Sequence, residues 1–227
     1  MLLLPENMDL AFSGLKNAFS KGTLDIKQLN EKVKKILDVK FKLGLDSLVL
    51  PNADNAVKMA FDPYAVGIKH KLIEQAITVV QNKRALIPMV NLTEPKIATL
   101  SIGMTTKTDY QNRLDSCMNA DRYHVSHSLK ETDVKSLLKD LKKYDRVIVS
   151  IHNMTNKVAS LFGLTHEELG LIQNINREQE MILVVFGSPY SLKYFENIDH
   201  LIMAYEDSPE IEDITAQGLV GVFGFKG

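Results

Sequence analysis

Acidic and histidine side chains are the residues of this sequence whose types and spacing could perform chemistry. The stretch YEDSPEIED carries five acids, namely Glu206, Asp207, Glu210, Glu212 and Asp213. Paired carboxylates cleave glycosidic bonds when they stand about 5 Å apart for retention, or about 6.5–9.5 Å apart for inversion. A structural interpretation competes with this one: Asp207 or Ser208 caps a helix whose first turn is acidic, as the helix dipole favours. Glu206, just before the cap, is the acid that the structural interpretation does not explain.

The sequence has six histidines, at positions 70, 124, 127, 152, 166 and 200. His124 and His127 lie three apart on a predicted strand, so they point to opposite faces and cannot readily share a metal. His166 belongs to an early helix turn in which Thr165 and Glu168 form a capping box. His152 is therefore the histidine that we retain for function, although a loop histidine is more often simply hydrogen-bonded. We expect no metal site and no cofactor.

No complete catalytic motif is present. SIGMTT, which begins at Ser101, lacks the glycine spacing of a dinucleotide or phosphate loop, HEEL lacks a second histidine, and G-x-S-x-G does not occur. The single Cys117 lies in a helix-like stretch without a neighbour that would activate a thiol, so we interpret it as a small apolar residue.

Helices and strands alternate from residue 68 onward. The predicted helices cover residues 68–81, 109–118, 131–142, 166–177, 190–195 and 209–220, and the predicted strands cover 96–102, 123–125, 146–151, 181–186 and 200–204. The runs ATLSI, RVIVSI and MILVVF are almost continuously apolar, which is typical of strands buried on both faces of a parallel sheet. The predicted fold class is therefore α/β: a three-layer sandwich with a mainly parallel, five- or six-stranded, doubly wound sheet.

Two helices with apolar stripes precede this pattern, over residues 8–21 and from Asp25 to about residue 44. Residues 46–67 carry two prolines without a sustained period, so they are predicted to be a linker. In doubly wound folds, ligands bind beyond the carboxyl ends of the strands. His152, Asn153 and Glu206 are predicted to lie there and are our candidate binding residues.

Composition excludes some classes of function. The chain has 227 residues, 45% of them hydrophobic and 24% charged, and a net charge of -1. This balance argues against a nucleic-acid surface, which needs a concentrated basic face. No apolar run approaches the length of a membrane span, and no signal peptide is visible. These features do not assign a cellular compartment, because they are compatible with a periplasmic or secreted protein and with a cytoplasmic one.

Several stretches, in this order, resemble glycoside hydrolase family 3. MLLLPENMDLAFSGLKNAFSKGTLDIKQLNEKVKKILDVKFKLGL, at residues 1–45, resembles the end of that family's catalytic barrel. AITVVQNKRALIPM, FGLTHEELGLIQNI, ILVVFGSPYSLKYF and GLVGVFGFKG resemble successive parts of its second domain. The resemblance divides the chain into residues 1–45, the last strand and helices of a truncated (β/α)8 barrel; 46–67, the linker; and 68–227, a C-terminal α/β domain.

The resemblance implies a parent that removes terminal β-linked sugars by retaining hydrolysis. The family's nucleophile lies in the barrel, so this chain would contain no catalytic residue. In the β-glucosidase branch a second-domain loop supplies the acid/base, but the matching loop here, IHNMTNKVASLFGL at residues 151–164, has no acid. This favours a parent of the β-N-acetylhexosaminidase type. We expect the chain alone to be inactive and to self-associate through its exposed barrel-remnant helices. Carbohydrate is the expected partner of the parent enzyme, and the missing barrel is the expected partner of this chain.

Two alternatives remain open at this stage. The chain could be a stand-alone, non-catalytic α/β module that binds a small ligand or a protein at the switch point, where the strand order of the sheet reverses. It could also be an independent enzyme that uses His152 and Glu206, although no third residue is predicted to orient them.

Overall fold

The computed structural model describes residues 5–48 and 52–227 and divides the chain into two units, residues 1–61 and 62–227. Residues 1–4, which resemble the end of a barrel strand, lie outside the described residues. No helix of the described part of the chain combines the length and hydrophobicity that a membrane span requires.

The first unit consists of helices. α1 (Met8–Ser20) begins at Asn7, whose side chain accepts the backbone N–H of Leu10, and α2 (Ile26–Lys42) begins at Asp25, as predicted. A third helix, α3 (Ala53–Ala60), lies within the segment that we predicted to be a linker, and Asn52 caps it. None of these helices buries a residue. Their structure therefore rests on capping and local pairing rather than on a core of their own.

The second unit is built around a six-stranded sheet with the strand order β1-β6-β5-β4-β2-β3. Its strands are β1 (Thr78–Asn82), β2 (Ile97–Ile102), β3 (Ala120–Val125), β4 (Arg146–Ile151), β5 (Glu180–Val185) and β6 (His200–Met203). All neighbouring pairs are parallel except β1 with β6, which is antiparallel. This mixed, mainly parallel sheet confirms the predicted fold class.

The edge strand β1 corrects one prediction. We expected a helix over residues 68–81, whereas α4 spans Pro63–Ala76 and residues 78–82 form β1. Asp62 caps α4, because its side chain accepts the backbone N–H groups of Tyr64 and Ala65, and Pro63 occupies the first helical position. The run Thr78, Val79 and Val80 is β-branched, which favours an extended backbone.

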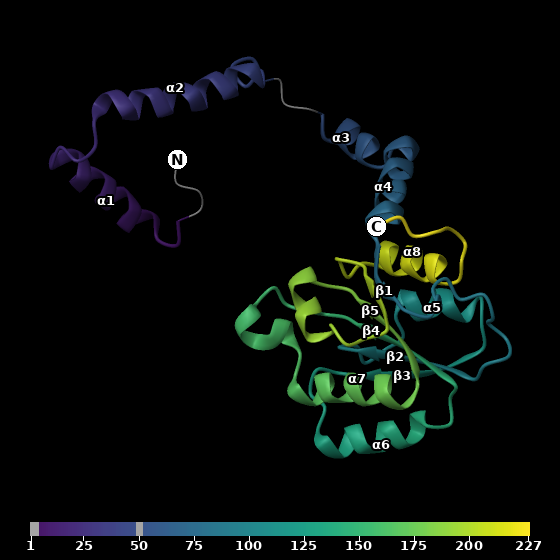
Figure 1. Ribbon diagram of the computed structural model, residues 1–227. Coiled ribbons are helices and arrows are strands. Elements are labelled where there is room, and N and C mark those ends of the chain that lie inside the picture. The colour runs from purple at the N-terminus through teal and green to yellow at the C-terminus, as the bar shows by residue number, and fades with distance from the viewer. Residues whose placement is uncertain (1–4, 49–51) are drawn as a thin grey trace. The chain divides into compact units, whose positions relative to one another are not determined.

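Helices cover both faces of the sheet (Figure 1). α6 (Glu131–Leu141) and α7 (His166–Glu178) lie on one face, and α5 (Asp109–Asp115) and α8 (Pro209–Leu219) lie on the other. Two short 3-10 helices, η1 (Val158–Gly163) and η2 (Pro189–Tyr194), follow β4 and β5.

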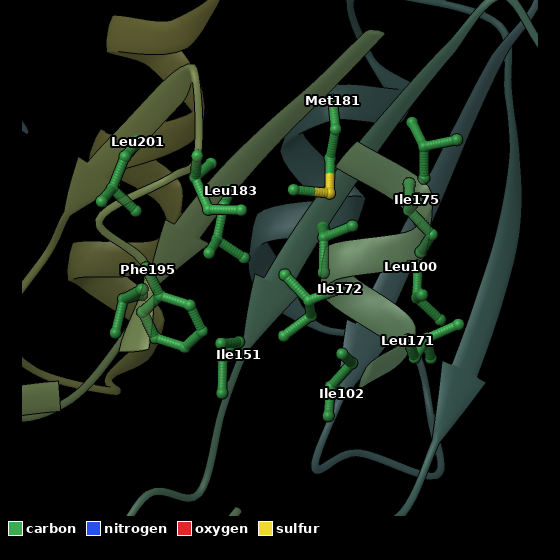
Figure 2. Packing of buried hydrophobic residues seen from close by; sticks show 14 of the residues in the cluster. Leu100, Ile102, Ile151, Leu171, Ile172, Ile175, Met181, Leu183, Phe195 and Leu201 are labelled. Atoms are coloured by element: carbon green, nitrogen blue, oxygen red, sulfur yellow. The ribbon is translucent and has the colours of Figure 1, made fainter. Parts of the chain in front are cut away.

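Alternate strand residues divide the core into two layers, because successive side chains of a strand point to opposite faces. Val147, Val149 and Ile151 of β4 belong to the layer under α6 and α7, whereas Ile148 belongs to the layer under α5 and α8. Figure 2 shows Ile172 of α7 among the strand residues of the first layer. The fully buried strands thus hold their carboxyl ends in fixed positions, where the candidate site lies.

Candidate functional site

The strand order of the sheet reverses between β2 and β4. β2 leads to β3 on one side, and β4, β5 and β6 follow on the other. Ligands of open α/β sheets bind at such a switch point, beyond the carboxyl ends of the strands. At this point Gly103 follows β2 and His152 follows β4, and the N–H of His152 donates to the carbonyl of Ile102 at 2.9 Å.

His152 is completely buried at the end of β4. Its ring stacks on Phe186, with centroids 4.7 Å apart and planes inclined by 19°. The Nδ1 atom lies 3.0 Å from Asp207 Oδ1 and 3.7 Å from Glu212 Oε1. Its Nε2 atom lies 2.9 Å from Ser150 Oγ, which in turn lies 3.1 Å from Ser101 Oγ. The ring is thus held on both nitrogens and on one face.

Backbone N–H groups orient the two carboxylates beside His152. Asp207 Oδ2 accepts from the N–H of Asn153 at 2.6 Å, and Glu212 Oε2 accepts from the N–H of Tyr110 at 2.9 Å. Each carboxylate therefore directs its other oxygen toward the imidazole. The three groups come from the β4 loop, the segment after β6, and α8, and the Glu212 contact also ties them to α5.

The two carboxylates have opposite pKa shifts. Burial opposes the ionisation of Asp207, but the hydrogen bonds from His152 and from the Asn153 N–H together hold the pKa of Asp207 below its usual range. Burial raises the pKa of Glu212 and outweighs the hydrogen bond from the Tyr110 N–H. A proton in this cluster therefore resides on Glu212 before it resides on Asp207.

A second histidine–carboxylate pair adjoins the first. His127 Nδ1 lies 3.1 Å from Glu168 Oε1, and His127 Nε2 lies 2.9 Å from the carbonyl oxygen of His152. Both ring nitrogens therefore face acceptors, which is the arrangement that an imidazolium satisfies. The hydrogen bond to Glu168 raises the pKa of His127 against the effect of burial. His127 and His124 do not come together here, since His124 Nε2 pairs with Gln111 Oε1 at 2.8 Å.

The three residues predicted to line the switch point have different positions. His152 and Asn153 lie together, and Asn153 donates its side-chain amide to the carbonyl of Gly103 at 2.8 Å. Asn153 is exposed and has a φ of 51°. Glu206 is also exposed, but it lines a separate shallow hollow between the end of β6 and α4, and it is not a hydrogen-bond partner of His152.

Sequence reasoning missed Asp207 and Glu212 as members of this cluster, because both were assigned to the acidic start of a helix. Ser208 is indeed the cap residue of α8, but its side chain makes no capping hydrogen bond. The predicted capping box of Thr165 and Glu168 is confirmed, yet Glu168 also binds His127. A useful signal was the position of Asp207, four residues past the end of β6.

No protein-family model matches the sequence, and no curated protein sequence matches it. Solved structures do match its fold. A glycoside hydrolase family 3 β-N-acetylglucosaminidase from Paenibacillus sp. str. FPU-7 has 14% identity and a TM-score of 0.64 over 96% of this chain and 42% of its own. A β-glucoside phosphorylase has 19% identity and a TM-score of 0.64 over 95% of this chain and 40% of its own. A β-glucosidase from Listeria innocua has 18% identity and a TM-score of 0.62 over 92% of this chain and 33% of its own.

This chain thus spans less than half the length of each of these enzymes. At such low identity the likeness concerns the fold. The chain has the fold of a part of these carbohydrate-processing enzymes, one of which is a glycoside hydrolase of family 3.

Proposed function

We propose that the chain is the C-terminal part of a family 3 glycoside hydrolase. In this proposal residues 1–45 close the catalytic barrel, residues 46–67 link it to the second domain, and residues 68–227 form that domain. Two independent observations support it. Stretches that resemble parts of the family occur in the family's order along nearly the whole chain, and the fold matches a family 3 enzyme over 96% of the chain.

The proposed parent removes terminal β-linked N-acetylhexosamine by retaining hydrolysis. The fold match does not select the sugar, because the β-N-acetylglucosaminidase and the β-glucoside enzymes match about equally well. The loop after β4 supports N-acetylhexosamine, because residues 151–164 carry no acid that could replace the acid/base of the β-glucosidase branch.

The chain by itself is proposed to be inactive. Retaining hydrolysis requires two carboxyl groups about 5–5.5 Å apart with the scissile bond between them. Asp207 and Glu212 are close enough, but His152 lies beside both of them and backbone N–H groups engage their other oxygens. The Glu212 side chain is also only 8% exposed. A sugar ring has no access between these two groups.

The role proposed for the second unit in the parent is to support one wall of the sugar site. Asn153 and Glu206 reach the surface and could contact a sugar, whereas the buried His152 would act by positioning Asn153 and Asp207. Carbohydrate is therefore a partner of the parent rather than of the isolated chain.

The helices of the first unit expose apolar side chains that a partner would cover. Their exposed apolar side chains include Phe12 at 67%, Phe41 at 68% and Leu43 at 69%. Leu15 and Phe19 of α1 share an apolar groove with residues of α2. Unpartnered surfaces of this kind mark protein contacts. In the parent the barrel would cover them, and in the isolated chain we propose that they drive self-association.

The experiment compares this chain with a longer chain that also contains the adjoining coding sequence. Both are assayed on 4-nitrophenyl N-acetyl-β-D-glucosaminide and 4-nitrophenyl β-D-glucoside, with and without added phosphate to detect phosphorolysis. We expect no turnover by the chain alone and release from the N-acetylglucosaminide by the longer chain. If the adjoining sequence encodes no barrel with a motif such as K-H-F-P-G-H, the stand-alone binding module replaces this proposal.

A further inference from the structure

His152, Asp207 and Glu212 bring three potential metal ligands to one point. One atom of each lies within 4.8 Å of the other two. A Zn²⁺ ion stands about 2.0–2.2 Å from nitrogen and oxygen ligands, which keeps neighbouring ligand atoms about 3–4 Å apart. The separations of 3.0 Å and 3.7 Å from Nδ1 to the two carboxylates match this span. The carboxylate oxygens of Asp207 and Glu212 also lie within 4.8 Å of each other, and the Asp207 side chain, which is 22% exposed, is the more accessible of the two.

The surrounding hydrogen bonds arrange these groups as the outer shell of a metal site does. Metal-bound histidines hold their second ring nitrogen on a hydrogen-bond partner, and ligating carboxylates are themselves hydrogen-bonded. Here Ser150 Oγ meets Nε2 of His152, and two backbone N–H groups hold the distal oxygens of Asp207 and Glu212. The ligand atoms are thus oriented by groups that would remain in place when an ion bound.

The Ser150 hydroxyl allows His152 to act in two states. When Nδ1 carries the proton and donates to Asp207, Ser150 donates to Nε2. When Ser150 instead accepts from Nε2–H and donates to Ser101 Oγ, the Nδ1 lone pair points at two carboxylates. In that second state either a proton on one of the carboxylates or a cation between the three groups balances the lone pair and the two acids. Among the described residues, His152 is the basic side chain within ion-pair distance of Asp207 or Glu212, so no lysine or arginine supplies this cation.

We propose that His152 Nδ1, Asp207 and Glu212 form a binding site for a divalent transition-metal ion of the Zn²⁺ type. Three protein ligands that include an imidazole suit Zn²⁺, with water completing the tetrahedron on the exposed side of Asp207. Ca²⁺ takes six to eight oxygen ligands and Mg²⁺ retains several waters on oxygen ligands, so neither fits this set. The ion would join the β4 loop to the start of α8. This proposal departs from our expectation that the sequence contains no metal site, and it does not rest on the proposed function.

The test uses the full, untagged chain after dialysis against EDTA. Isothermal titration with ZnCl₂ is expected to give one site per chain with a Kd of about 10 µM or lower, and the melting temperature is expected to rise by about 5 °C at saturation. Co²⁺ provides a spectroscopic probe, since a bound ion with nitrogen and oxygen ligands absorbs in the visible range. Ca²⁺ and Mg²⁺ at millimolar concentration are not expected to displace it.

Matched variants locate the site. Asp207→Asn keeps the acceptor for the Asn153 N–H but removes a charged ligand, and Glu212→Gln does the same beside Tyr110; each should weaken binding at least tenfold. Glu206→Gln removes a neighbouring charge and should leave the Kd unchanged. His70→Gln controls for the partly exposed His70–Glu74 pair on α4, which could also bind Zn²⁺.

Two results would overturn the proposal. One is the absence of saturable Zn²⁺ binding by the folded wild-type chain at 100 µM metal. The other is an equal Kd for Asp207→Asn and Glu206→Gln. If Glu212→Gln does not fold, Asp207→Asn with its Glu206→Gln control still decides the question.

Discussion

Gly103 occupies the most crowded backbone position at the switch point, so its replacement by alanine is a direct test of how the site is assembled. It has a φ of 89°, and an added Cβ would lie 2.4 Å from His127 Nε2 and 2.4 Å from the carbonyl oxygen of His152. These are the two atoms of one hydrogen bond. The methyl group of Gly103→Ala must therefore break the His127–His152 contact or move β2 away from β4.

The expected magnitude has two parts. A positive φ costs a non-glycine residue about 1–2 kcal/mol. Loss of a hydrogen bond from a charged donor, which leaves a buried carbonyl without its partner, costs about 1.5–3 kcal/mol. Gly103→Ala should therefore lower the free energy of unfolding by about 3–5 kcal/mol. With a urea m-value of about 2 kcal/mol/M, the midpoint should fall by about 2 M.

The assay is urea unfolding followed by tyrosine fluorescence. All seven tyrosines lie between residues 64 and 205, so this signal reports on the second unit alone. The matched control is Gly221→Ala, where φ is 82° but the nearest atom to an added Cβ is 3.5 Å away. It should show the backbone cost alone, about 1–2 kcal/mol. If Gly103→Ala loses no more stability than Gly221→Ala, the reasoning about the crowded contact is wrong.

Three further predictions concern the core, a buried histidine and the first unit. Leu183→Ala, at a fully buried position of β5, should lower the free energy of unfolding by about 2–5 kcal/mol in the same urea assay, and a loss below about 1 kcal/mol would contradict the described packing. Burial lowers the pKa of His200 in the folded chain. The stability contributed by neutral His200 is therefore complete above the unfolded pKa of about 6.5 and is lost as the pH falls toward the lower folded pKa. His200→Gln should reduce this acid-induced loss of stability, measured as urea midpoints against pH, whereas the surface control His166→Gln should show the same loss as the wild type. Size-exclusion chromatography with light scattering should show that the full chain associates as its concentration rises. The double variant Phe12→Ser/Phe41→Ser should reduce this association, whereas Tyr190→Ser, an exposed aromatic control in the second unit, should not. A monomer at all concentrations would refute the association.

Much of the fold follows from local patterns in the chain. Strands β2, β4 and β5 are buried along all or nearly all of their length and are recognisable as apolar runs, since strands covered on both faces need no polar alternation. Capping residues such as Asp25 and Thr165 mark helix starts, because their side chains satisfy nearby backbone N–H groups. β1 was missed for a corresponding reason. Its β-branched run is short, and its place at the edge depends on pairing with β6, more than one hundred residues later, which no local pattern reveals.

The candidate site, like the fold, follows only in part from the sequence. His152 could be selected from sequence because it directly follows a predicted strand, and strand ends of a parallel sheet meet at one edge. The order of the strands and the placement of α8 determined that Asp207 and Glu212, rather than Glu206, lie beside it. In the chain these three acids lie within seven residues of one another, around the start of a helix. Only packing distinguishes them, because a turn of α8 buries Glu212 against α5 while Glu206 stays at the surface. The residue types in the sequence thus indicate which chemistry is available. Tertiary packing decides which groups share a proton or a cation, because sharing depends on distances and burial that no local pattern contains.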